Sequence, residues 1–173
     1  LELINRPGYS RAYPQGTGEQ LYRRSLYTFW KRTVPSPMMK TLDAPEREFC
    51  TLKRSLTNTP LQSLLLLNGI QFVEAARHMA TAVLHQPFES DSQRMSHAFR
   101  VATGRPPDNT ELELLLEAFQ QQAVDFQNDT ESVTNLLSVG DSPVDTSVNA
   151  VELATWTALC RILLNLDESI TKG

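Results

Sequence analysis

The sequence predicts an all-α fold, and three observations lead to that prediction. Apolar residues recur at spacings of three and four along several segments, which places them on one face of an α-helix. Residues that favour helix starts and stops stand at the ends of most of these segments. No segment alternates apolar and polar residues between hairpin turns, so no β-strand is expected. We therefore expect about five amphipathic helices in a compact orthogonal or bundle-like array.

The first part of the chain is expected to be an irregular arm over residues 1–19, rich in turn-forming Pro and Gly, followed by one helix. That helix must end before Pro35, because the residue before a proline avoids α-helical backbone angles. A short helix is predicted over 44–50, where Asp43 caps the first turn. The apolar face of the helix that ends before Pro35 comprises Tyr22, Leu26, Phe29 and Trp30.

A longer helical segment is predicted to begin at Pro60 and to end before Gln86-Pro87. Thr59 is a suitable cap, and a proline is well tolerated in the first turn. Asn68-Gly69 falls inside the segment and is expected to kink or interrupt it. The predicted inward residues are Leu61, Leu65, Phe72, Ala76, Met79 and Val83.

Two further helices are predicted in the middle of the chain. One covers 91–103 and ends at Gly104, which favours the left-handed backbone that closes helices. The next begins with a capping box of Thr110 and Glu113. Its apolar face comprises Leu112, Leu115, Leu116, Phe119, Ala123 and Phe126.

An acidic loop is expected over 127–147, with a short helical turn at 131–138, before a final helix over 147–168. A single helical domain is therefore predicted for residues 20–173. The inward face of the final helix comprises Val148, Val151, Thr155, Ala158, Leu159, Ile162 and Leu166.

Charge divides the chain unevenly. Residues 1–54 contain ten Lys or Arg and five Asp or Glu, a balance of +5, whereas residues 55–173 contain six and fifteen, a balance of −9. A basic segment of this kind favours an anionic partner or packing against the acidic remainder of the molecule. We expect no nucleic-acid binding, since the isoelectric point is near 5.4 and nucleic-acid-binding domains are usually far more basic.

Several classes of protein are excluded by missing motifs. No apolar run approaches the length of roughly 18 residues that a membrane span needs. The sequence has no CxxC, CxxCH, HExxH, GxSxG or phosphate-binding glycine motif, so we expect no cofactor or metal in this segment. Cys50 and Cys160 are expected to be buried free thiols. The alternative is a disulfide between them, which requires a fold that brings the two residues together.

The densest candidate binding residues lie in residues 22–32, where aromatics stand beside cations. Such a pattern can stack sugars and bind anionic groups, or it can be a helix whose aromatics are core. Asp43, Glu46 and Glu48 offer an acid–base pair, although pairing with Arg47, Lys53 and Arg54 explains the same charges. The candidate binding residues are Arg23, Arg24, Tyr27, Trp30, Arg32, Asp43, Arg47, Glu48 and Asn58.

Four stretches of the chain resemble one protein family. They are Arg24 to Thr33, Asp43 to Cys50, Thr57 to Gln62, and Leu159 to Glu168. They resemble the C-terminal domain of planctomycete cytochrome-c-domain proteins, the DUF1553 or PSD1 family. The resemblance implies a multidomain, exported bacterial protein with a periplasmic or otherwise extracytoplasmic location, of which this chain, starting at Leu1, is a piece. It implies no activity, and the family's upstream haem motif is absent here.

The sequence thus predicts a non-catalytic helical interaction module. Its expected partner is the upstream domain of the same polypeptide or a separate protein, contacted through the basic first third of the chain. The alternative is a glycan-binding or glycan-processing domain that uses the aromatic and basic residues 22–32 with nearby carboxylates.

Overall fold

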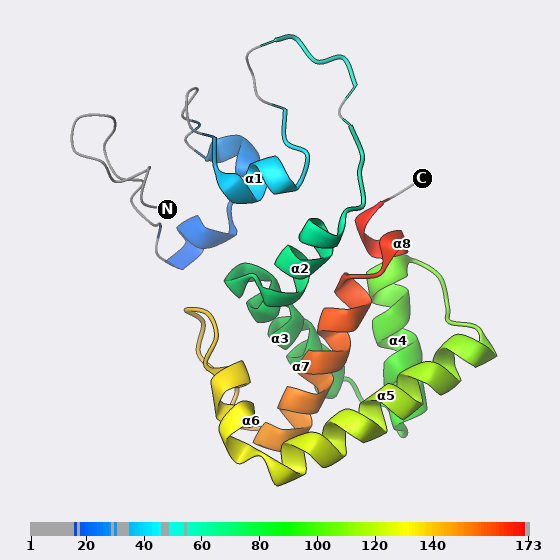
Figure 1. Cartoon of the computed structure of the whole chain (residues 1–173). Coiled ribbons are helices and arrows are strands. Elements are labelled where there is room, and N and C mark those ends of the chain that lie inside the picture. Colours follow the sequence, from blue (N-terminus) through cyan, green and yellow to red (C-terminus); the bar gives the residue numbers. More distant parts are fainter. Residues whose placement is uncertain are drawn as a thin grey trace. The chain divides into compact units, whose positions relative to one another are not determined.

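The computed structural model describes residues 16, 18–28, 30, 35–45, 49–53 and 55–171. The chain divides into two compact units, residues 1–57 and 58–173, which are described separately (Figure 1). The boundary between the two units falls inside the single domain predicted for residues 20–173, so that single domain stays a prediction. In the described ranges all regular structure is helical, which confirms the all-α class, with eight α-helices rather than about five. None of the described helices is both long and apolar enough to cross a bilayer.

The predicted helix before Pro35 is wrong over its described part. The chain instead forms two short 3₁₀ turns, η2 (Gly18–Tyr22) and η3 (Ser25–Tyr27), separated by an Arg24 backbone at φ −58° and ψ 142°. Tyr22 and Leu26 are 55% and 65% exposed. An amphipathic helix gains most of its stability from burying its apolar face, and these two residues of the predicted face are exposed. Phe29, residues 31–34 and residues 1–15 lie outside the described residues.

A short helix does form in this unit, but earlier than predicted. Helix α1 (Pro37–Thr41) begins after Ser36, with a proline in its first turn, and buries Met39. The described ends of the predicted segment 44–50 are not helical, and residues 46–48 lie outside the description. Asp43 follows the end of α1 with a left-handed φ of +57°, a conformation that a short polar side chain tolerates.

The second unit begins with the predicted long helical segment, broken in two. Helix α2 (Pro60–Asn68) starts with a capping box of Thr59 and Gln62, and helix α3 (Ile70–Leu84) follows. Gly69 interrupts them as predicted, with φ −68° and ψ 131°. A Cβ there would lie 2.8 Å from the Leu65 carbonyl oxygen, so glycine fits this junction. The expectation that Leu61 points inward is wrong, since its side chain is 60% exposed.

Helices α4 (Asp91–Thr103), α5 (Asn109–Asn128) and α6 (Thr130–Leu137) follow the predicted order. Gly104 closes α4 with φ +88°. The capping box at the start of α5 lies two residues before the predicted one. Asp108 accepts a hydrogen bond from the Glu111 backbone N–H at 2.7 Å, and the Glu111 carboxylate accepts one from the Asp108 backbone N–H. Helix α6 confirms the short helix inside the acidic segment and buries Val133 and Leu137.

The predicted final helix is two helices, α7 (Ala150–Leu164) and α8 (Asp167–Ile170), separated by an extended Leu166. Helix α7 runs through the middle of the second unit and packs against α3, α5, α6, α4 and α2 (Figure 1). All residues from Leu153 to Cys160 are buried, so the one-sided stripe predicted for this helix is wrong. Ile162, expected inside, is 40% exposed.

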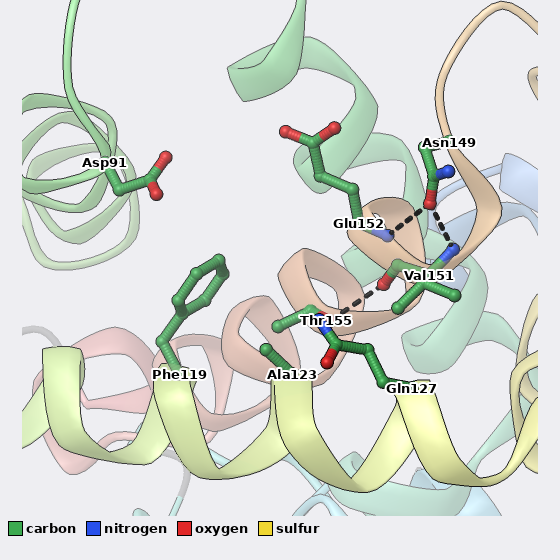
Figure 2. Close-up of a pocket in the computed structure, with 8 residues that line it drawn as sticks. All are labelled: Asp91, Phe119, Ala123, Gln127, Asn149, Val151, Glu152 and Thr155. Atoms are coloured by element: carbon green, nitrogen blue, oxygen red, sulfur yellow. Dashed lines mark hydrogen bonds between the residues drawn. The ribbon is translucent and has the colours of Figure 1, made fainter.

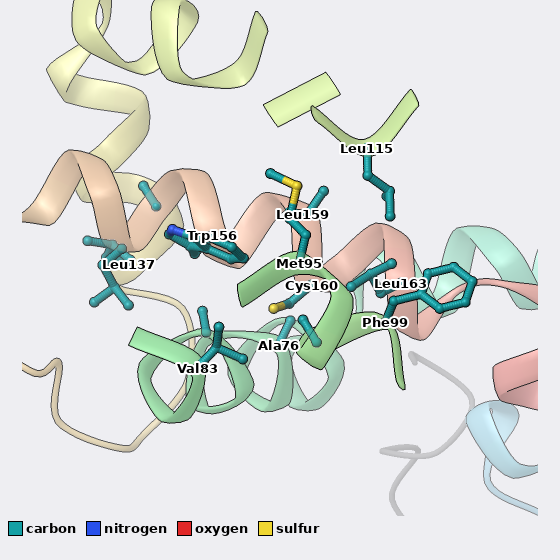
Figure 3. Packing of buried hydrophobic residues seen from close by; sticks show 14 of the residues in the cluster. Ala76, Val83, Met95, Phe99, Leu115, Leu137, Trp156, Leu159, Cys160 and Leu163 are labelled. Carbon is teal, nitrogen blue, oxygen red and sulfur yellow. The ribbon is translucent and has the colours of Figure 1, made fainter. Parts of the chain in front are cut away.

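The core forms around the buried helix α7, as Figure 3 shows. Trp156 is fully buried, and its ring centroid lies 4.9 Å from that of Phe119 on α5. The hydroxyls of Thr155 and Thr157 donate to carbonyl oxygens one turn back, at 2.7 and 2.6 Å, so these polar groups enter the core satisfied. The other labelled core residues are Ala76, Val83, Met95, Phe99, Leu115, Leu137, Leu159, Cys160 and Leu163.

We predict that Trp156→Ala lowers the free energy of unfolding by about 3–5 kcal/mol, because it leaves a cavity at the centre of the core. Urea denaturation measures the change. Trp156→Phe should cost clearly less, since the Trp156 Nε1–H has no hydrogen-bond partner among the described residues. Val124→Ala, at a position 52% exposed on α5, should change stability by less than about 0.5 kcal/mol. Equal losses for Trp156→Ala and Val124→Ala would contradict this account of the core.

Candidate functional site

The candidate binding residues of the first unit are largely exposed where the structure describes them. Arg23, Arg24 and Tyr27 are exposed around the two 3₁₀ turns, and Tyr27 is 67% exposed. Trp30 is half-buried. Arg32, Arg47 and Glu48 lie outside the described residues, so the aromatic and basic cluster as a whole stays a prediction.

Asp43 and Asn58 make separate contacts in different units. The Asp43 carboxylate accepts hydrogen bonds from the Thr57 backbone N–H at 2.8 Å and from the Thr57 hydroxyl at 2.7 Å. These bonds close the loop between residues 43 and 57. Asn58 donates from Nδ2 to Asp167 Oδ1 at 2.7 Å and thereby holds the start of α2 to the start of α8. Both side chains therefore have structural roles.

A first hollow, of about 410 Å³, lies between the start of α4, the middle of α5 and the start of α7. Figure 2 shows the Phe119 ring between the carboxylates of Asp91 and Glu152. Asp91 pairs with Arg94 at 3.0 Å. Asn149 Oδ1 accepts two backbone N–H groups of α7, so part of the polar lining serves the start of that helix.

A second hollow, of about 420 Å³, lies between α5 and the end of α7, and α8 borders it. We call it the α5–α7 groove. Its lining is mostly apolar, with charged side chains at the edge. Its lining residues are Phe99, Arg105, Glu111, Leu114, Leu115, Ala118, Ile162, Leu166, Asp167 and Glu168.

Arg105 is the centre of the charged edge of the α5–α7 groove. Its guanidinium binds Glu111 with hydrogen bonds of 2.8 and 2.6 Å, and Glu168 with bonds of 2.9 and 2.8 Å. The guanidinium carbon also lies 5.0 Å from the centroid of the Phe99 ring. The bonds to Glu111 and then Glu168 raise the pKa of Arg105, so the guanidinium stays charged. This network joins the loop after α4 to the first turns of α5 and α8.

Sequence reasoning missed a buried charged pair on α3. Glu74 and Arg77 are 2% and 3% exposed, with Oε1 and Nη2 3.7 Å apart. Arg77 donates to the carbonyl oxygens of Leu137 and Ser142, and Glu74 accepts the Ser142 backbone N–H at 2.6 Å. The pair therefore holds the loop after α6 against α3. The available signal was two charges, three residues apart, on a mostly apolar helix.

Two histidines, His78 within α3 and His85 directly after it, contact the same loop. His78 Nε2 lies 2.7 Å from Ser142 Oγ, and His85 Nε2 lies 2.7 Å from Asp145 Oδ2. Hydrogen bonds from Ser147, followed by the one from His85, lower the pKa of Asp145 to about 2. No group of three potential metal ligands occurs in the residues that the structure describes.

The two cysteines are both free thiols, in different surroundings. Cys160 is buried in the core, and burial raises the pKa of its thiol to about 12, which leaves it unreactive. Cys50 is exposed, so the expectation that both thiols are buried is wrong for Cys50.

The fold and these sites define an all-helical protein in the part of the chain that the structure describes. The charged groups given above mainly hold its loops and helix ends. A sequence-family model, PSD1, described as a protein of unknown function (DUF1553), matches residues 3–119. The chain therefore belongs to the DUF1553 family. No curated protein and no solved structure matches it. Helices α6, α7 and α8, and with them one wall of the α5–α7 groove, lie beyond the matched residues.

We predict that Gly140→Ala destabilises the protein more than Gly104→Ala. Both glycines have left-handed backbones, at φ +98° and +88°, so each substitution costs roughly 1–2 kcal/mol of backbone strain. A Cβ at Gly140 would also lie 2.6 Å from Glu74 Cδ and displace the buried carboxylate, whereas nothing lies within 4 Å of one at Gly104. Thermal or urea unfolding compares the two variants, and equal losses would refute the proposed role of Glu74.

We also predict that the stability contributed by Glu111 depends on pH. The Arg105 hydrogen bonds, followed by the Asp108 backbone N–H, lower the pKa of Glu111 from 4.5 to about 2. A carboxyl with a lowered folded-state pKa stabilises the protein above its unfolded pKa and loses that contribution as pH falls. Glu111→Gln should therefore be less stable than the parent at pH 6, and the difference should shrink between about pH 4.5 and 2.

Urea titrations across this pH range measure the Glu111 effect. Glu113→Gln, on the same helix at an exposed position, is the matched control and should change stability little at any pH. A Glu111→Gln difference that stays constant from pH 6 to 2 would show that the carboxylate charge is not what stabilises this corner.

Proposed function

We propose that this chain is a non-catalytic interaction module that docks on a protein surface through residues 18–57. The observation that carries the proposal is the exposure of large apolar side chains in this segment, from 55% to 100%. Protein-binding sites are rich in such residues, above all aromatics. The exposed side chains are Tyr22, Leu26, Tyr27, Phe49, Leu52 and Leu56.

Charge indicates the chemistry of the partner surface on which this segment docks. Residues 1–54 carry a balance of +5, and Arg23 and Arg24 are exposed between the two 3₁₀ turns. Arginine beside exposed aromatics is typical of the centre of protein interfaces. The complementary surface is therefore apolar with acidic groups around it.

The partner we propose is the domain that precedes this one in a longer polypeptide. The resemblance described above supports that arrangement, together with a planctomycete source and a periplasmic or otherwise extracytoplasmic location. The contacts of His78, His85, Arg77 and Arg105 also support a non-catalytic module, because each holds a loop or a helix end.

Hydrogen exchange tests the docking directly. Amides of residues 18–57 should exchange at least about tenfold more slowly in the longer natural polypeptide than in the 173-residue chain, because docking buries them. The double substitution Leu26→Ser and Tyr27→Ser should remove this protection. Leu61→Ser, at a position 60% exposed in the second unit, is the matched control and should leave it unchanged.

Exchange in α7 is the internal reference, since its amides lie in the core of the second unit and should not respond to docking. Equal exchange of residues 18–57 in the two polypeptides would refute the proposal.

Glycan binding is the second candidate, because Tyr27, Arg23 and Arg24 are accessible where the structure describes them. An array of neutral and sulfated polysaccharides separates the two functions. Binding to the array that Tyr27→Ala removes would favour the glycan function over protein docking.

A further inference from the structure

The α5–α7 groove combines an apolar hollow with exposed apolar walls. Leu114 on α5 and Ile162 on α7 line it, and they are 61% and 40% exposed. Leaving such side chains in water forgoes the favourable free energy of their burial. Because both walls are exposed, the groove suits a side chain presented by another protein surface better than an enclosed small molecule.

Arg105 cannot serve as an anchor for an anionic ligand. A guanidinium has five N–H donors, and all five of those on Arg105 are used. Nε donates to Glu168, Nη1 to Glu111 and the Pro106 carbonyl oxygen, and Nη2 to Glu111 and Glu168. A carboxylate or phosphate at this edge would have to displace a charged partner that is already bound in good geometry.

The edge of the groove carries an excess of negative charge. Three carboxylates, Glu111, Asp167 and Glu168, face one cation, Arg105, which leaves a local balance of −2. Asp167 accepts hydrogen bonds from Asn58 at 2.7 Å and from the Thr171 hydroxyl at 3.1 Å, and both donors are neutral. A complementary ligand therefore places a positive charge beside its apolar group.

We infer that the α5–α7 groove binds a basic peptide segment of a partner protein. A large aliphatic side chain of that segment enters between Leu114 and Ile162, and a neighbouring Lys or Arg lies against Asp167. The groove extends the proposed interaction function to a second surface. Every residue that lines it lies between 99 and 168, so its test is independent of docking through residues 18–57.

Short peptides test the inference on the whole chain. The probe is an acetylated and amidated Gly-Ser-Arg-Leu-Arg-Ser-Gly peptide, titrated into isotopically labelled protein and followed by NMR chemical shifts. Saturable shifts are expected at Leu114, Ala118 and Ile162. Replacing the peptide leucine with serine, or both arginines with glutamate, should weaken binding by at least about tenfold.

Two variants with a matched control place the site. Leu114→Ser should weaken binding about tenfold, whereas Val124→Ser, at an exposed position on the same helix, should not. Asp167→Asn keeps the acceptor for Asn58 but removes the charge, so it should weaken binding and flatten its dependence on salt. Thermal unfolding of each variant confirms that the fold is retained, as expected for side chains at the surface.

Four results would overturn the inference. They are no binding at millimolar peptide, equal binding of the glutamate peptide, equal effects of Leu114→Ser and Val124→Ser, and self-association that Leu114→Ser abolishes. The last result, measured by sedimentation velocity, would show that the groove is occupied by a second copy of the chain rather than by a basic partner.

Discussion

The second unit depends on the burial of α7 on all sides. A helix with eight consecutive buried residues needs partners around its whole circumference, and α2, α3, α4, α5 and α6 provide them. Helices α3, α4, α5 and α6 then need only one apolar face, which is why their sequences are amphipathic, whereas α7 carries apolar residues around most of its circumference. Both hollows also lie along α7, one beside its start and one beside its end, and α5 lines each of them.

Charged side chains hold the parts of this unit that the core does not reach. The Glu74–Arg77 pair binds the loop after α6, and Arg105 binds the short helix α8 and the start of α5. Removing either partner of the buried Glu74–Arg77 pair would leave an unpaired charge away from water, so the two side chains stabilise the loop together. At the α5–α7 groove the ion pairs are more exposed, and Arg105 binds Glu111 and Glu168 through four hydrogen bonds that connect the loop after α4 to α5 and α8.

The two units present different surfaces. Residues 18–57 expose aromatic and aliphatic side chains among basic residues, whereas the second unit is acidic and exposes apolar side chains at its α5–α7 groove. Both surfaces suit protein partners, and they favour partners of opposite charge. A chain with two such surfaces is suited to connecting other parts of a larger assembly, in keeping with the interaction function proposed for it.

The sequence by itself determined the all-α class, the order of the helices in residues 60–171, the caps at Thr59 and Gly104, and the interruption at Gly69. These features depend on backbone preferences and spacing, which are local. Only the tertiary structure decided that α7 is buried on every side, that Leu61 and Ile162 face solvent, and that residues 18–27 form 3₁₀ turns rather than a helix. It also brought together Glu74, Arg77 and Ser142, and Arg105 with Glu168, across 63 to 68 residues of chain. Such contacts depend on which surfaces find partners, and periodicity along one segment carries no information about the segment packed against it.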